Sequence, residues 1–410
     1  MMAQGCDFLI VGAGIVGLTC ALEIRRREPA SRIIVLEKER SPGRHSSGRN
    51  SGVLHSGIYY PPGTLKARVC GEGARRMAQY CEDRGLPINR IGKLLIPTRR
   101  KDGDQLNLLY LRGAENDVEI ERIDAAALAR MEPETRSATG EALFVPTTAV
   151  VDSSAVLASI VKDATDAGIT MLCGGALSHV DHIRRTAYWG GERIAYGHAV
   201  NTSGLHADSV ARQFGLHHDL RLLPFKGIYW KLAPEAGLKI NHLIYPVPDL
   251  RVPFLGIHTT TAIDGTVYLG PTSVPAFGRE HYAGVKGIDR DLPWIVGTLA
   301  SQFAAGRDGF RRLALQEGPR YLKRNFVEAA RRLLPRLASE HLRPTDKVGI
   351  RAQMLNLSTR QLVTDFVVRG GPSSTHVLNA ISPAFTSAFP LAEIICDQIF
   401  QPEHLHANQG

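Results

Sequence analysis

The chain has 410 residues, 44% of them hydrophobic and 22% charged, which is an ordinary composition for a globular protein of one large or two smaller domains. Its formal net charge is +9, but the basic residues are not confined to one tail, so nucleic-acid binding is not expected. No apolar run approaches the roughly 20 residues of a membrane helix, and no signal peptide is visible before the first strand pattern.

The N-terminal segment predicts a βαβ unit. Phe8–Val11 is a short apolar strand, and a helical pattern runs from about Ile15 to Arg27. Arg32–Glu37, "RIIVLE", is a second buried strand. A strand, helix and strand in this order favour a parallel sheet with a right-handed crossover.

Two later segments are interpreted as returns to the same sheet, with a different texture between them. Val150–Gly175 predicts a helix and a strand, followed by a strand at Ala195–Gly204, and Ser374–Ile399 predicts a strand, a turn and a helix. Arg221–Leu269 alternates apolar and polar residues with Gly and Pro, which indicates antiparallel strands. Leu292–Leu337 is predicted to be helical and is rich in arginine.

The cysteines and the C-terminal tail favour no metal site. The six cysteines are scattered without a CxxC pair, which predicts reduced thiols in a cytoplasmic protein rather than a disulfide framework or a zinc site. The two histidines of the tail, "QPEHLHANQG", are expected to be solvated.

The turn after the first strand carries a dinucleotide-binding pattern. Gly12, Gly14 and Gly17 form GxGxxG between a strand and a helix, where glycines let the backbone turn tightly and approach a pyrophosphate. The helix N-terminus supplies N–H groups and a partial positive charge to that anion. Glu37 ends the second strand, where a carboxylate can accept hydrogen bonds from the ribose hydroxyls of an adenosine. The alternative is that the glycines only pack the helix against the strand.

The stretch from Ser46 to Ala67, "SSGRNSGVLHSGIYYPPGTLKA", suggests which dinucleotide is bound. An NAD-binding domain would continue with another helix and strand, whereas here flexible glycines, small hydrogen-bonding residues and Arg49 follow the acid. Such residues suit FAD, an extended cofactor whose second phosphate and ribityl chain need contacts over a distance. A flexible surface loop is the alternative, and the His and Tyr residues that follow argue against it.

These motifs resemble the FAD-dependent oxidoreductases of the D-amino acid oxidase superfamily, and more narrowly the L-2-hydroxyglutarate oxidase/dehydrogenase family. The matching segments include "VGAGIVGL", "GRHSSGRNSGVLHSGIYYPPGTLKA", "GKLLIPT", "NTSGLHAD", "LPFKGIYW", "VGIRAQ" and "HVLNAISPAFTSA", in the family's order over nearly the whole chain. The chain departs from the family pattern at Thr261, Thr364 and Phe385.

The resemblance implies an α/β fold with a discontinuous, Rossmann-like FAD-binding domain and an α+β substrate domain built on an antiparallel sheet. We expect the FAD-binding domain in residues 1–90, 146–218 and 345–410, and the substrate domain in residues 91–145 and 219–344. A helix that starts within Ser382–Thr386 would place its N-terminus near the flavin ring. The expected cofactor-binding residues are Gly12, Gly14, Ile15, Val16, Gly17, Glu37, Lys38, Ser46, Ser47, Arg49, Asn50, Ser51, Gly52, Gly204, Pro383, Ala384, Phe385 and Thr386.

The implied chemistry is the oxidation of a 2-hydroxy acid, which needs a base and cations. His55 is the expected base, because an imidazole suits proton transfer near neutral pH. Arg351, in "GIRAQ", is expected to hold a substrate carboxylate through a bidentate fork. Lys226 and His258 are weaker candidates, since either could be an ordinary strand residue. Of the adjacent Tyr59 and Tyr60, Tyr60 is expected to face the ligand and Tyr59 to pack in the core.

Three functions stay open from the sequence. The leading one is FAD-dependent oxidation of L-2-hydroxyglutarate, or a close 2-hydroxy acid, with oxygen, a quinone or a flavoprotein as electron acceptor. A second is the oxidation of amino acids or secondary amines. A third is a membrane-associated flavin electron carrier, because Arg320–Leu337 combines arginines with apolar residues at helical spacing. A cytoplasmic location is expected, with peripheral contact at the inner face of the membrane as an open alternative.

Overall fold

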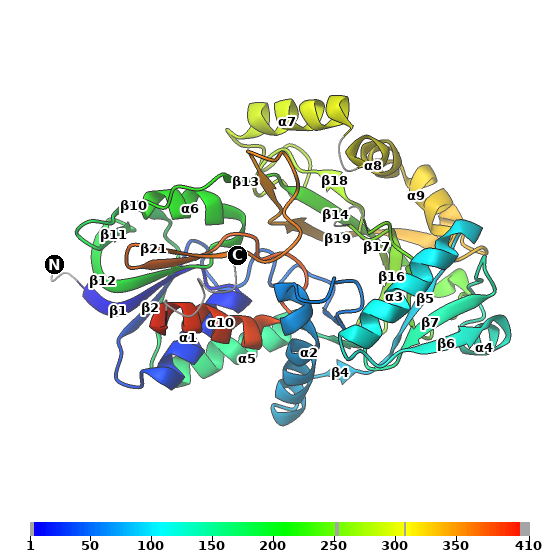
Figure 1. The fold of residues 1–410 in the computed structure, drawn as a ribbon, viewed down its shortest axis with the longest axis horizontal. Coiled ribbons are helices and arrows are strands. Elements are labelled where there is room, and N and C mark those ends of the chain that lie inside the picture. Colours follow the sequence, from blue (N-terminus) through cyan, green and yellow to red (C-terminus); the bar gives the residue numbers. More distant parts are fainter. Residues whose placement is uncertain (1–3, 251–253, 307–308, 402–410) are drawn as a thin grey trace. The chain divides into compact units, whose positions relative to one another are not determined.

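The computed structural model describes residues 4–250, 254–306 and 309–401, and the two tail histidines discussed above lie outside them. The chain divides into two compact units, each assembled from separate segments (Figure 1). The first unit contains residues 1–49, 153–223 and 351–410, and the second contains residues 50–152 and 224–350. Each unit is a group of segments that contact one another more than they contact the rest of the chain. The boundaries expected for an FAD-binding domain and a substrate domain stay a prediction.

The first unit is built on a largely parallel sheet, as the sequence predicts. β1 (Gln4–Val11) pairs in parallel with β2 (Ile33–Glu37) and with β12 (Glu192–Asn201). β9 (Thr170–Cys173) extends the sheet beyond β2, and β22 (Ser374–Val377) pairs in parallel with the end of β12. Both segments predicted to return to this sheet therefore do so. The remaining strands of this sheet are antiparallel: β10 (Leu177–Asp181), β11 (Thr186–Trp189) and β21 (Val368–Gly371).

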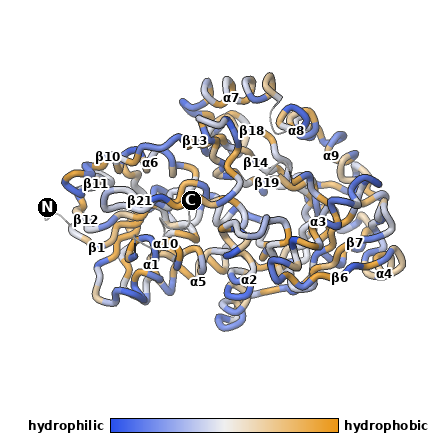
Figure 2. The backbone as a smooth tube through the Cα atoms, viewed as in Figure 1, coloured by the Kyte–Doolittle hydropathy of each residue, from blue (hydrophilic) through white to orange (hydrophobic). Residues whose placement is uncertain are grey.

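The central strands β1 and β2 of this sheet are rich in apolar residues, and helix α1 packs against both. All five residues of β2 are buried, as expected for a strand with both faces covered. The strands β1 and β2 appear as apolar segments in Figure 2. The helices of the unit are α1 (Ile15–Arg27), α5 (Ser153–Asp166), α6 (Ala207–Gln213) and α10 (Ala388–Phe400), and β13 (Leu220–Leu222) pairs with β20 (Met354–Asn356).

The second unit contains the antiparallel strands expected from Arg221–Leu269, with one exception. β14 (Phe225–Leu232), β16 (His258–Thr261), β17 (Val267–Gly270), β18 (Val274–Pro275) and β19 (Leu342–Arg351) form one sheet, whose assigned pairings are antiparallel. β15 (Leu243–Pro246) belongs instead to a second sheet, where it pairs in parallel with β5 (Lys93–Ile96). β5 pairs in turn with β7 (Glu141–Val145), and β7 with β6 (Glu121–Asp124).

Short strands and helices complete the second unit. A three-stranded sheet contains β3 (Val53–Leu54), β8 (Ala149–Val151) and β4 (Ile88–Asn89). The helices are α2 (Leu65–Asp83), α3 (Gly103–Glu115), α4 (Ala125–Met131), α7 (Leu292–Ala305), α8 (Phe310–Glu317) and α9 (Lys323–Ala330).

The segment Arg320–Leu337 is not the continuous amphipathic helix that the sequence suggested. A 3₁₀ turn (Gly318–Tyr321) precedes α9, and residues after Ala330 form turns. The apolar residues at helical spacing pack into a core of the second unit; they are Phe326, Val327, Ala330, Leu333, Leu334 and Leu337. Core packing therefore explains the periodicity that favoured a membrane-surface helix. In the parts of the chain that are described, no helix has the length and apolar character needed to cross a membrane.

Candidate active site

The turn after β1 can be built only with glycine at two of its three fingerprint positions. Gly12 has a φ of +106°, and a Cβ on it would lie 2.8 Å from the Thr202 carbonyl oxygen. A Cβ on Gly17 would lie 2.0 Å from the Gly12 carbonyl oxygen. Real Cβ atoms do not approach a carbonyl oxygen so closely, so both glycines let α1 start directly against the ends of β1 and β12.

The start of α1 has the properties of an anion site. Its N-cap residue is Gly14, which has no side chain to cap the helix, and its first turn carries no acidic residue. The Ile15 amide donates to Ser47 Oγ over 2.9 Å, so the Ser46–Ser47 segment passes the helix N-terminus. The positive end of this 13-residue helix, whose first turn has no acidic side chain, fits the pyrophosphate of a dinucleotide.

Glu37 is held in place at the end of β2. Its carboxylate is buried and accepts hydrogen bonds from the Ala13 amide at 3.0 Å and the Glu39 amide at 2.9 Å. A carboxylate has about four lone-pair sites, so two remain for the ribose hydroxyls expected there. Lys38 contacts its neighbours Glu39 and His45, with 3.0 Å between Lys38 Nζ and His45 Nε2.

The polar stretch after β2 is ordered by its own hydrogen bonds. Arg49 Nε donates to the Arg44 carbonyl at 3.0 Å, and the Gly52 amide donates to Asn50 Oδ1 at 2.7 Å. The Val53 amide approaches Ser51 Oγ at 3.4 Å. Gly52 has a φ of +74° and approaches β8 so closely that a Cβ would lie 2.2 Å from the Val151 oxygen. The stretch is thus a shaped turn rather than a flexible surface loop.

Two other segments expected to contact the cofactor lie in the first unit, and one needs correction. Gly204 starts a 3₁₀ turn with a φ of +55°, and a Cβ on it would meet open space. α10 starts at Ala388, not within Ser382–Thr386, where the chain forms turns. The Ser387 amide donates to the Pro383 carbonyl at 3.0 Å, so these turns lead into the helix. Ala384 and Thr386 are buried and Phe385 is half-buried.

In the second unit, His55 belongs to a basic cluster with His258 and a lysine. His55 is half-buried, and burial, with Lys93 and His258 nearby, lowers the pKa of its imidazole to about 3. His258 Nδ1 lies 2.8 Å from the Gly256 carbonyl oxygen, and its ring stacks on Tyr245 with 3.8 Å between ring centres. The structure therefore brings together the two histidines that the sequence predicted as site residues.

Lys93 is the member of this cluster that sequence reasoning missed. It begins β5, is fully buried, and places its ammonium 4.8 Å from the centre of the Tyr59 ring and 5.7 Å from that of Tyr245. Its Nζ lies 3.5 Å from Ser56 Oγ. The sequence does carry a sign of it, because in "GKLLIPT" a lysine opens an otherwise apolar strand.

The other residues predicted to contact the substrate are Lys226 and Tyr60, in the second unit, and Arg351. Lys226, on β14, is buried with its ammonium 5.7 Å from the centre of the Tyr321 ring, and burial lowers its pKa. Tyr59 is buried and Tyr60 is half-buried, with Lys66 Nζ 5.5 Å from the centre of the Tyr60 ring. Arg351, the last residue of β19, is half-buried and belongs to the first unit.

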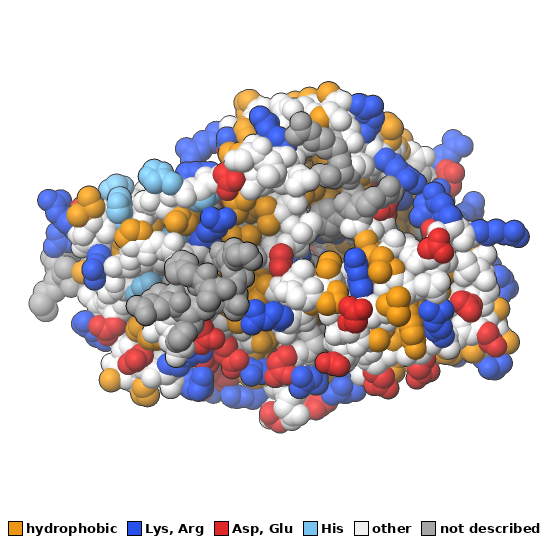
Figure 3. Space-filling view, viewed as in Figure 1, with side chains coloured by type: hydrophobic (Ala, Val, Ile, Leu, Met, Phe, Trp, Pro, Cys, Tyr) orange, Lys and Arg blue, Asp and Glu red, His pale blue; other side chains and the backbone are white. Residues whose placement is uncertain are grey.

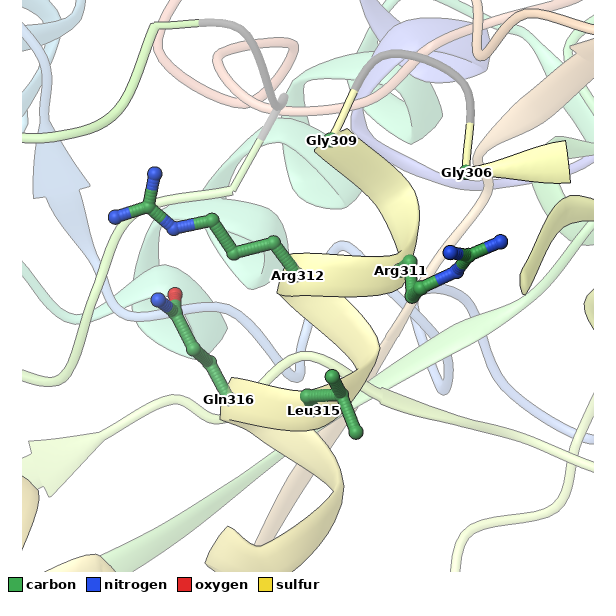
Figure 4. A pocket seen from close by; sticks show the side chains of 6 residues that line it. All are labelled: Gly306, Gly309, Arg311, Arg312, Leu315 and Gln316. Atoms are coloured by element: carbon green, nitrogen blue, oxygen red, sulfur yellow. The ribbon is translucent and has the colours of Figure 1, made fainter. Parts of the chain in front are cut away.

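An open depression at the start of α8 does not have the character of an active site. Figure 4 shows Arg311 and Arg312 pointing to different sides of the helix. Arg311 Nε donates to the Phe303 carbonyl at 2.9 Å, so this arginine closes the C-terminal end of α7. The residues that line the depression are Gly306, Gly309, Arg311, Arg312, Leu315 and Gln316.

Comparisons with known proteins agree with these features. Residues 7–398 match the family model described as "FAD dependent oxidoreductase" (DAO). The chain is 35% identical to the L-2-hydroxyglutarate dehydrogenase of Escherichia coli strain K12 over 398 residues, which cover 96% of this chain and 93% of the relative. It is 34% identical to the mitochondrial L-2-hydroxyglutarate dehydrogenase of Homo sapiens, over 96% of this chain and 89% of the relative.

A solved structure shows the same fold at lower sequence identity. The L-alpha-glycerophosphate oxidase of Mycoplasma pneumoniae, determined with FAD bound, matches with a TM-score of 0.75. The match covers 97% of this chain and 95% of that chain at 18% identity, so it bears on the fold alone. The glycine turn, the N-terminus of α1 and Glu37 fit the dinucleotide part of FAD. The chain belongs to the family of FAD dependent oxidoreductases, and its cofactor is FAD.

Proposed function

We propose that this protein oxidises L-2-hydroxyglutarate, or a closely related 2-hydroxy acid, to the corresponding 2-oxo acid. The observation that carries the proposal is identity of 35% over nearly the whole length of a relative named L-2-hydroxyglutarate dehydrogenase. The basic cluster around His55 supports it, because a 2-hydroxy acid brings at least one carboxylate that needs positive charge nearby.

The residues of this chain have separate roles in the proposal. FAD, when bound, accepts the hydride that leaves the substrate carbon. His55 accepts the hydroxyl proton, since its imidazole is uncharged over the physiological pH range. Arg351 holds a carboxylate through its guanidinium fork, while Lys226, His258 and Tyr60 are weaker candidates for contacting the substrate.

The remaining predictions about the flavin site belong to the same proposal. In this proposal the FAD-binding domain consists of residues 1–90, 146–218 and 345–410, and the substrate-binding domain consists of residues 91–145 and 219–344. The contacts run from the glycine turn along Glu37, Lys38 and the Ser46–Gly52 stretch to Gly204 and Pro383–Thr386. Supporting observations are the absence of an acidic residue from the first turn of α1 and the Ile15–Ser47 hydrogen bond.

Anaerobic substrate screening tests the reaction. The purified protein is mixed without oxygen with L- and D-2-hydroxyglutarate, shorter 2-hydroxy acids, amino acids and secondary amines, and flavin absorbance is followed. L-2-hydroxyglutarate is expected to bleach the flavin fastest, with the D-enantiomer as the matched control. Bleaching by an amino acid or amine alone would assign the protein to the alternative function and contradict the proposal.

The electron acceptor and the location of the protein extend this proposal. Oxygen, a quinone or an electron-transfer flavoprotein would each complete the reaction, and repeating turnover with each acceptor identifies it. Peripheral membrane contact is supported only by exposed apolar side chains near arginines around α7 and α8, where Figure 3 shows both kinds of side chain; they include Phe303, Leu315, Tyr321 and Leu322. Co-sedimentation with anionic vesicles at low salt tests it, and no pelleting would exclude it.

A further inference from the structure

Lys93 carries a buried charge that no carboxylate among the described residues balances. It lies on the interior strand β5, between β15 and β7, and its side chain has no exposed surface. Among the residues that the structure describes, no carboxylate forms an ion pair with its ammonium. The hydroxyl of Ser56, at 3.5 Å, is too far away to be a strong hydrogen-bond acceptor.

The tyrosine rings compensate this charge only in part. Tyr59 and Tyr245 face the ammonium at 4.8 and 5.7 Å, distances at which a cation–π contact is favourable but weaker than an ion pair. Burial lowers the pKa of Lys93 to about 8, so at pH 7 the side chain is still mostly an ammonium. A buried, unpaired ammonium is costly, and such a group is generally neutralised, paired or functional.

A second lysine of the same unit shows the ordinary arrangement. Lys347 Nζ lies 4.4 Å from the centre of the Tyr268 ring and 5.7 Å from that of Tyr229. Asp264 and Asp152 favour its charged form and oppose the pKa-lowering effect of burial. Both lysines therefore contact two tyrosine rings, but only Lys347 has carboxylates to balance its charge.

The side chains around Lys93 leave the local charge positive. His55 and His258 are its basic neighbours. The Tyr245 ring lies between Lys93 and His258, because it contacts the ammonium of Lys93 and stacks on the imidazole of His258. The acidic groups nearby are the thiol of Cys70 and the phenols of Tyr59 and Tyr245, and burial keeps all three protonated. The positive charge of Lys93 is therefore available to attract an anion that binds beside His55.

We propose that Lys93 supplies the uncompensated positive charge that draws a dicarboxylate into the site beside His55. The lysine acts through space, as a positioning charge, because its side chain has no exposed surface and lies against the Tyr59 and Tyr245 rings. The inference rests on the proposed function, since it takes His55 as the site of the reaction, and it specifies the substrate class as dianionic. We expect this charge to change the affinity for a dianion roughly 10- to 100-fold, which corresponds to about 1.4–2.8 kcal/mol.

The test compares the binding of two ligands that cannot be oxidised at a hydroxyl carbon. Titration calorimetry at pH 7 measures the Kd of the FAD-loaded protein for glutarate, a dianion, and butyrate, a monoanion. Lys93→Met is expected to weaken glutarate binding roughly 10- to 100-fold and butyrate binding clearly less, because an electrostatic effect scales with ligand charge. Lys347→Met, the matched control, is expected to leave both Kd values within about twofold of the unmodified protein.

Three results would overturn the inference: unchanged glutarate binding in Lys93→Met, an equal loss for both ligands, or the same loss in Lys347→Met. An equal loss would indicate a distorted site rather than a missing charge. Methionine has a similar shape and removes a costly charge, so Lys93→Met is expected to melt at the same or a higher temperature. If that variant does not retain FAD, Lys93→Gln provides the same comparison.

The result does not depend on whether the proposed reaction is correct. Glutarate has no hydroxyl group and cannot be oxidised in this way, so its Kd is measurable whether or not the proposed reaction takes place. If glutarate binds and Lys93→Met weakens it while no 2-hydroxy acid reduces the flavin, the proposed reaction fails and the role of Lys93 stands. If L-2-hydroxyglutarate reduces the flavin and Lys93→Met leaves glutarate binding unchanged, the proposed reaction stands and the role of Lys93 fails.

Discussion

At the scale of single residues, the charge state of His55 is set by its neighbours. Burial is the largest cause of its low pKa, and the positive charges of Lys93 and His258 act in the same direction. An uncharged imidazole can accept a proton, but a base with a pKa of about 3 accepts it reluctantly. The arrival of a carboxylate opposes those positive charges and raises the pKa of His55, so substrate binding itself strengthens the base.

Replacing the proposed base tests this view. His55→Gln keeps a hydrogen-bonding side chain of similar size but cannot take up a proton. We expect the rate of flavin reduction by L-2-hydroxyglutarate to fall roughly 10²- to 10⁴-fold. The Kd for glutarate should change by less than about threefold, because an uncharged side chain replaces an uncharged one. Stopped-flow absorbance and calorimetry provide the two measurements, and a fast His55→Gln variant would remove His55 as the base.

At the scale of elements, the first βαβ unit is where sequence and structure agree best. The helix predicted from about Ile15 to Arg27 has these bounds in the structure, and both strands end where expected, although β1 starts at Gln4 rather than at Phe8. The reason is that the turn chemistry, the apolar pattern and the glycines at close contacts all act locally. The segment Arg320–Leu337 shows the opposite case. Its apolar residues recur at helical spacing, but only Lys323–Ala330 form the helix α9, and the leucines that follow are buried in turns.

A glycine of the fingerprint gives the prediction at this scale. In Gly17→Ala the new Cβ would meet the Gly12 carbonyl oxygen at 2.0 Å and Thr202 Oγ1 at 2.6 Å. α1 must then move away from β1, so we expect a lower melting temperature and loss of bound FAD after gel filtration. Gly297→Ala, at an exposed position within α7 where a Cβ meets nothing within 4 Å, is the control and is expected to be neutral or stabilising by up to about 1 kcal/mol. Full FAD retention by Gly17→Ala would contradict the role of the tight turn.

At the scale of the whole molecule, the chain is divided between two units that each combine distant segments. The sheet of the first unit joins strands from residues 4–11, 192–201 and 374–377, so its stability depends on contacts across nearly the whole chain. A buried histidine lies at one of these junctions. His376, on β22, lies with its Nδ1 3.2 Å from the Asn201 side-chain nitrogen and its Nε2 2.9 Å from Ser374 Oγ.

This histidine makes the protein sensitive to acid. Burial, with His218 and His198 nearby, lowers the pKa of His376 to about 3, against 6.5 for the unperturbed side chain. Between these values the unfolded chain binds a proton that the folded protein does not, so its stabilising contribution, complete above pH 6.5, is lost as the pH falls towards 3. We expect the melting temperature of the unmodified protein to fall between pH 6.5 and 4, and to fall less steeply in His376→Gln. His179→Gln, on the exposed side of β10, is the control and should follow the unmodified protein; an equal slope in all three would contradict the assignment.

The sequence by itself determined the cofactor class, the parallel sheet and the order of the family's motifs. These properties depend on short-range chemistry, such as glycines in a turn and apolar periodicity, which a linear reading captures. Only the tertiary structure decided that Lys93 is buried near His55 with no carboxylate paired to it among the described residues, and that α10 starts at Ala388. A charge is balanced or left unbalanced by residues from separate strands, and a helix starts where the surrounding packing lets its first hydrogen bonds form, so neither is written in the local sequence.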